Sequence, residues 1–167
     1  ISCGAMAVTG AISRVEAVDG SMVYETIGDI GARPIGLCGT GLIDAVAALL
    51  KLEWMDETGA LEDDDVVLAP GVVLTQKDIR SMQLAKAAIA AGIATLLEVS
   101  NTDPDEIETL YLAGGFGSHL NIQSAAAIGL FPEELTDKVK VIGNAALAGA
   151  AQLLLNEPNI ASMRSLA

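Results

Sequence analysis

The fold of this 167-residue chain depends most clearly on residues 109–118, which read Thr109-Leu110-Tyr111-Leu112-Ala113-Gly114-Gly115-Phe116-Gly117-Ser118. The first five residues predict a short buried strand, and three glycines follow it at once. Glycines at the carboxyl end of a strand let the backbone approach a ligand that side chains would exclude. The same spacing also fits a tight turn that packs Phe116 into the core, so a ligand loop and a structural turn both remain open.

The same order of strand, glycine and helix recurs on both sides of this segment. Residues 34–38 predict a strand that leads through Gly39-Thr40-Gly41 into a helix reaching Leu50, and residues 139–142 precede an Ala-rich helix ending near Leu155. Strands that alternate with helices indicate an α/β fold with a parallel layer.

Two further regions complete the predicted elements. Glycines that separate short apolar runs in the first thirty residues indicate β-hairpins, and residues 56–65 form an acidic loop. Thr75 is a candidate N-cap with Asp78 three residues later, and a 3.6-residue apolar period then predicts a helix over residues 76–99.

Composition excludes several classes of protein. The net charge of −13 and nine scattered Lys and Arg residues argue against nucleic-acid binding, because phosphates would be repelled. The apolar stretch 85–97 contains Lys86 and is shorter than the roughly 20 residues of a membrane span. Cys3 and Cys38 form no C-x-x-C pair, which suits a reducing cytoplasm and leaves no basis for an iron–sulfur cluster here.

Gly39-Thr40-Gly41 is a second candidate ligand site. The N–H groups at the start of the following helix are suited to holding a phosphate, and Thr40 adds a hydroxyl. Asp44, expected in the first helical turn, is placed to hold a water bound to Mg²⁺, or merely to favour the helix N-terminus through its charge. Asp44 also replaces the third glycine of G-x-G-x-x-G, which argues against a dinucleotide-binding motif. The P-loop pattern G-x-x-x-x-G-K-[ST] is absent from the sequence as well.

Three other polar residues have less specific surroundings. Gln83 and Lys86 lie one turn apart on the long predicted helix, where Lys86 either contacts a nucleotide or extends to solvent. His119 directly follows the glycine segment and is expected at the surface or as a cap rather than as a catalytic base.

Several segments taken in order resemble one family. The segments are Ile1 to Ile12, Leu37 to Ala45, Leu74 to Ile89, Leu110 to Leu120, and Gly143 to Ala150. The chain thereby resembles the C-terminal ATPase domain of the reductive activators of corrinoid and iron–sulfur proteins.

The resemblance implies a ribonuclease-H-like subdomain of the superfamily that includes acetate and sugar kinases, heat-shock chaperones and actin, with a mixed sheet flanked by helices. It implies that Gly114, Gly115, Phe116, Gly117 and Ser118 form the adenosine loop. It also implies that Gly39, Thr40 and Gly41 face phosphate, and that Gln83 and Lys86 contact nucleotide. The implied cofactor is ATP or ADP with Mg²⁺, near Asp44.

The resemblance also implies parts outside these residues. Because Ile1 opens in mid-pattern, we expect residues 1–167 to be one C-terminal portion, with an upstream subdomain and a ferredoxin-like domain carrying a two-iron, two-sulfur cluster. The implied partner is a corrinoid protein or methyltransferase system whose cob(I)alamin is restored, and a homodimer remains open. A docking module without nucleotide, and a small-molecule kinase of the same fold, are the alternatives.

Overall fold

The computed structural model describes residues 1–29, 31–155 and 163. Its first unit is a sheet with strand order β2-β1-β3, in which β1 (Ala11–Val18) and β2 (Ser21–Thr26) form an antiparallel hairpin. The short strand β3 (Gly36–Leu37) pairs with the start of β1 in parallel. The hairpin expected near the N-terminus is therefore confirmed, and the sheet is mixed.

Strand β1 contains a β-bulge at Ser13. Ile12 pairs with Thr26 and Arg14 pairs with Glu25, so two steps along β1 match one step along β2. An extra residue of this kind bends a strand and changes the direction of its side chains. Core residues Ile12 and Val15 consequently stand three positions apart on the buried face.

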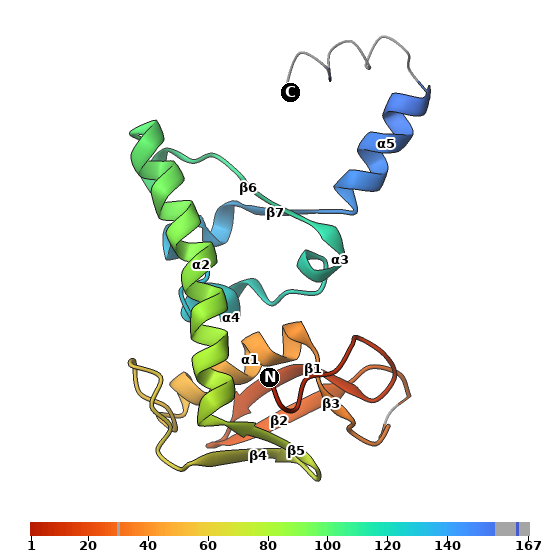
Figure 1. The fold of residues 1–167 in the computed structure, drawn as a ribbon, viewed down its shortest axis with the longest axis vertical. Coiled ribbons are helices and arrows are strands. Elements are labelled where there is room, and N and C mark those ends of the chain that lie inside the picture. The colour runs from red at the N-terminus through yellow and green to blue at the C-terminus, as the bar shows by residue number, and fades with distance from the viewer. Residues whose placement is uncertain (30, 156–162, 164–167) are drawn as a thin grey trace.

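Helix α1 (Gly39–Lys51) packs across this sheet (Figure 1). The sequence predicted a glycine turn followed by a helix, but Gly39 is already the first helical residue, and Asp44 therefore lies in the second turn rather than the first. A Cβ atom on Gly41 would collide with the backbone oxygen of Ile12. Glycine at this position is what allows the helix to approach the strand so closely.

The next unit is a hairpin of β4 (Asp65–Ala69) and β5 (Val72–Thr75), which leads into the 25-residue helix α2 (Gln76–Ser100). Thr75 and Asp78 form the expected capping box at its start. The Asp78 carboxylate also accepts hydrogen bonds from the amide and hydroxyl of Ser2, each at 2.6 Å. Burial would raise the pKa of Asp78, but these bonds from Ser2 and Thr75 lower it to about 2.

The C-terminal third holds a separate parallel pair, β6 (Leu110–Ala113) and β7 (Val139–Gly143). Between them lie α3 (Gly114–Gly117), α4 (Ile122–Ala127) and the 3₁₀ helix η2 (Glu133–Lys138), while η1 (Pro104–Glu106) precedes β6 and α5 (Ala145–Leu155) follows β7. The expected strands and helices are thus present. They are distributed over three small sheets, because β6 and β7 do not pair with β1 within the described residues.

The hydrophobic core is concentrated in one half of the molecule. It is formed by β1, α1, the β4-β5 hairpin, the start of α2 and residues 125–135. In contrast, α2 beyond Met82, β6, β7 and α5 expose large apolar side chains, among them Leu84, Leu96, Tyr111, Val141 and Leu154. Figure 1 shows these elements extending away from the core half.

Helix α2 is long and apolar enough to cross a membrane, judged by length and composition alone. The apolar stretch of residues 85–97 is only part of this apolar helix, and the helix's most apolar window is 6% buried. Length and composition are weak evidence for a span, because helices that pack against other protein segments pass the same test.

We expect Gly41→Ala to lower the free energy of unfolding by about 1–3 kcal/mol, because its Cβ would collide with the β1 backbone. Gly92→Ala is the matched control, since Gly92 lies in α2 with open space around it. That control should raise the stability by about 0.5–1 kcal/mol through helix propensity. Urea unfolding of both variants tests the contact, and equal effects would contradict it.

Candidate nucleotide site

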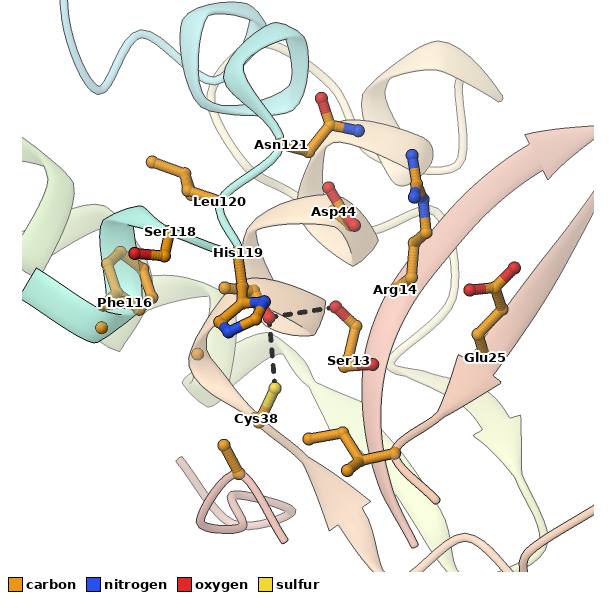
Figure 2. Close-up of a pocket in the computed structure, with 15 residues that line it drawn as sticks. Ser13, Arg14, Glu25, Cys38, Asp44, Phe116, Ser118, His119, Leu120 and Asn121 are labelled. Carbon is orange, nitrogen blue, oxygen red and sulfur yellow. Dashed lines mark hydrogen bonds between the residues drawn. The ribbon is translucent and has the colours of Figure 1, made fainter. Parts of the chain in front are cut away.

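A cavity of about 790 Å³ lies between the β1-β2 hairpin, the N-terminus of α1 and the segment 115–121 (Figure 2). It is lined by Ala7, Ser13, Arg14, Glu25, Ile27, Cys38, Gly39, Thr40, Asp44, Gly115, Phe116, Ser118, His119, Leu120 and Asn121. Its volume falls in the range of roughly 300–1,000 Å³ that is usual for small-molecule sites. The two glycine segments found in the sequence therefore meet at one cavity.

Direct packing joins these two segments. A Cβ atom on Gly39 would lie 2.9 Å from Cε2 of Phe116, so the aromatic ring rests against the first residue of α1. Phe116 is half exposed and lines the cavity, in contrast to a side chain packed in the core. Gly114, with φ of +90°, allows the abrupt change of direction from β6 into α3.

The N-terminus of α1 opens onto the cavity without a side-chain cap. The first N–H groups of an α-helix have no partner within the helix, and they carry a partial positive charge. The Thr40 hydroxyl donates a hydrogen bond to the Ser13 carbonyl at 3.0 Å and lies 3.3 Å from Cys38 Sγ. Because that hydroxyl proton is already used, the backbone of Gly39 and Thr40 supplies the donors available to an anion.

Asp44 is a buried carboxylate with one unsatisfied oxygen. Its Oδ2 accepts a hydrogen bond from the Val15 amide at 3.4 Å, while the buried Oδ1 has no hydrogen-bond partner. The pKa of Asp44 is raised, chiefly by burial and also by the Glu16 carboxylate, against the opposing effects of Ser124, the Val15 amide and Arg14. A buried, unpartnered carboxylate oxygen on a cavity wall is suited to a cation or a ligand donor.

The residues predicted from the sequence divide into three groups. Six line the cavity: Gly39, Thr40, Asp44, Gly115, Phe116 and Ser118. Gly41, Gly114 and Gly117 do not line it and instead shape the backbone around it, Gly41 against β1 and Gly117 against Leu112.

Gln83 and Lys86 lie elsewhere, on the wall of a separate small cavity of about 60 Å³ between α1 and α2. Gln83 donates a hydrogen bond to the Thr58 carbonyl and accepts one from Arg80. Lys86 Nζ would lie 3.1 Å from a Cβ on Gly129. The structure therefore gives both residues local contacts and does not bring them to the cavity that holds Phe116.

Several cavity residues were not predicted from the sequence: Ser13, Arg14, Glu25 and Asn121. His119, expected at the surface or as a cap, is directed into the space between Cys38 and Ser118 in Figure 2 and lines the cavity. Ser13 and Arg14 are adjacent in a strand, so no sequence pattern indicated that both would face the same side. The Asn121 side chain caps α4 by accepting hydrogen bonds from the Gln123 and Ser124 amides. This structural role is sufficient to explain an asparagine at this position.

The fold and the cavity together define an α/β domain whose candidate site combines the N-terminus of α1 with the glycine-rich segment after β6, in which Gly114–Gly117 form the short helix α3. The model of the family described as the C-terminal domain of RACo, the ASKHA domain, matches residues 1–167. The chain therefore belongs to this family, and the family resemblance and actin-like fold class predicted from its motifs are confirmed.

Two curated relatives and one solved structure show the same similarity. The corrinoid activation enzyme RamQ of Eubacterium limosum is 30% identical over 185 residues, which cover 94% of this chain and 31% of that protein. A protein of Methanosarcina barkeri, named [Co(II) methylated amine-specific corrinoid protein] reductase, is 28% identical, with 88% of this chain and 28% of that protein covered.

The solved structure is a reductive activator for corrinoid,iron-sulfur protein, with a TM-score of 0.83 and 33% identity. The match covers 96% of this chain and 29% of that one. The chain thus spans less than a third of the length of each of these relatives.

We expect Asp44→Asn to stabilise the ligand-free protein at neutral pH. Burial raises the folded-state pKa of Asp44 above its unfolded value, so ionisation costs stability as the pH rises through the folded pKa. The asparagine carbonyl still accepts the Val15 hydrogen bond without a charge. The gain in melting temperature should be largest at pH 7 and should shrink as the pH falls toward 4.

Melting curves of both proteins between pH 4 and 8 measure this difference. A variant that is less stable at every pH would show that the charged carboxylate is needed by the fold itself.

Proposed function

We propose that this chain is the nucleotide-binding part of an ATP-dependent reductive activator that restores cob(I)alamin in a corrinoid protein. The observation that carries the proposal is the cavity in which the uncapped start of α1 faces the Gly115–Ser118 loop. The family match over the whole chain and the printed names of the relatives support the same conclusion. Each relative is more than three times as long as the segment that it shares with this chain, so the activity belongs to a longer protein.

The shape of the cavity fits a nucleotide. The N–H groups at the start of α1 suit phosphate oxygens, because the helix dipole favours an anion there. The half-exposed Phe116 ring, together with Ile27 and Leu120, offers apolar surface of the kind that a base or ribose covers. Gly115 has open space around it and leaves room for a ligand beside the loop.

Asp44 is the residue that we expect to hold Mg²⁺, directly or through water. Magnesium commonly binds one or two carboxylates together with substrate phosphates, so a cluster of protein ligands is unnecessary. Within the described part of the chain, no group of three or more His, Cys, Asp or Glu residues is arranged to hold a metal ion. The unpartnered Oδ1 of Asp44 therefore fits a metal that arrives with a nucleotide.

Nucleotide binding would add contacts between two parts of the chain that belong to different units of the fold. The α1 N-terminus belongs to the core half, whereas the Gly115–Ser118 loop follows β6. A ligand that contacts both favours the arrangement in which they are close, and its binding energy is then available to change the affinity for a partner protein. ATP, when bound, supplies a phosphate chain whose hydrolysis makes this change reversible.

The remaining parts of the proposed activator lie outside these residues. The two-iron, two-sulfur cluster would be carried by an upstream ferredoxin-like domain, in keeping with Cys3 and Cys38 being free. The apolar faces of α2, β6 and β7 are expected to pack against an upstream subdomain. We place the whole protein in the cytoplasm, acting on a corrinoid protein or methyltransferase system, with a homodimer as one arrangement to be examined.

Gly115→Leu should weaken the binding of Mg-ADP and Mg-ATP by about tenfold or more, because a bulky side chain enters the cavity. Gly92→Leu, at an open position on α2, is the matched control and should bind normally. Isothermal titration calorimetry measures both affinities, and melting curves check that Gly115→Leu remains folded. Equal binding by both variants would show that the cavity is not the nucleotide site.

The redox part of the proposal is tested on the intact protein that contains this chain. After reduction by dithionite, low-temperature EPR should show the signal of a reduced two-iron cluster, and added ATP should accelerate reduction of a cob(II)alamin protein. A protein with no cluster signal that still turns over ATP with a small substrate would instead be a kinase of the same fold. Capture of a corrinoid protein without any nucleotide binding would identify a docking module.

A further inference from the structure

The cavity contains one strongly basic side chain among the described residues that line it. Arg14 is that residue, and the neighbouring charges are the carboxylates of Glu25 and Asp44. In a chain with a net charge of −13, an arginine that faces a cavity is an unusual use of a scarce residue type. Its guanidinium group carries fixed positive charge and five N–H donors, which match phosphate geometry.

The bulge in β1 is what brings Ser13 and Arg14 together at the cavity. Adjacent residues of a regular strand point to opposite faces, yet Ser13 and Arg14 both line this cavity. Ile12 pairs with Thr26 and Arg14 with Glu25, so Ser13 is the additional residue. Bulges are known to redirect side chains beside functional sites.

Arg14 keeps most of its hydrogen-bonding capacity free. Its Nε lies 2.9 Å from Glu16 Oε1, and this is the one ion pair recorded among the described residues. Both side chains are 53% exposed, and exposed pairs of this kind contribute little stability. Figure 2 shows the guanidinium group extended along the cavity toward Asn121, beside Asp44.

We propose that Arg14 contacts the phosphate chain of the nucleotide and makes the cavity discriminate ATP and ADP from adenosine. The inference rests on the proposed nucleotide-binding function and names the residue that recognises the charge of the ligand. Arg14 approaches from β1, while the backbone donors come from the start of α1. The phosphates would therefore be held from two sides.

The nearby carboxylates define the form of the ligand. Glu25 and Asp44 would repel a bare polyphosphate, whereas a magnesium complex presents a cation to them and phosphate oxygens to Arg14. Arg14 is thus a specificity residue for the Mg-nucleotide, acting through direct contact. No bond is made or broken by its side chain.

The test compares ADP with adenosine on the intact protein by isothermal titration calorimetry in the presence of Mg²⁺. Arg14→Gln should weaken ADP binding by about tenfold or more, because charge-assisted hydrogen bonds to phosphate are lost. Adenosine binding should change by less than about twofold. Arg14→Lys keeps the positive charge but lacks the planar guanidinium group. Its affinity for ADP should therefore lie between those of the wild-type protein and Arg14→Gln.

Lys51→Gln is the matched control, because it removes one positive charge at the far end of α1. It should leave both affinities unchanged, which separates a local contact from the effect of net charge. Unchanged ADP binding by Arg14→Gln, or an equal loss for ADP and adenosine, would overturn the role of Arg14 while leaving the nucleotide site intact. If the wild-type protein bound neither ligand, the proposed function would fail and the role of Arg14 with it.

Discussion

The close approach of α1 to β1 is the contact on which the rest of the structure depends. Gly41 removes the Cβ that would collide with the Ile12 carbonyl, and the helix can then lie directly against the strand. Beyond the end of β3, the Thr40 hydroxyl donates a hydrogen bond to the Ser13 carbonyl, and the Asp44 carboxylate accepts one from the Val15 amide. Polar side chains of the helix thus continue the hydrogen bonding that a longer β3 would have provided.

Much of the fold followed from periodicity and from a few capping and turn residues. The apolar repeat and the Thr75 cap predicted α2 to within one residue at its C-terminal end. The start of α1 was placed too late, because glycine is a poor helix former and its tertiary contact with Ile12 is invisible in local sequence. The division into three small sheets was equally hidden, since strand pairing depends on distant residues.

The candidate site was also predicted only in part, because local sequence patterns do not show which distant residues meet. Glycine-rich segments are easily recognised in a sequence, and both Gly39-Thr40 and the Gly115–Ser118 segment line the cavity. Gln83 and Lys86 lie one turn apart on α2, which places both at a separate cavity, with Lys86 next to Gly129. Arg14 and Glu25 face the cavity because of strand register, which a single sequence does not reveal.

The bulge at Ser13 has a consequence for the evolutionary comparison of such chains. Removing Ser13 would restore a regular strand in which Ile12 and Val15 still face the core and Arg14 still faces outward, because the alternation would then have no interruption. The carbonyl that accepts the Thr40 hydroxyl would be lost with it. A one-residue gap at this point in an alignment would therefore mark a family member that retains the hydrophobic core but lacks the Ser13 contact at the cavity wall.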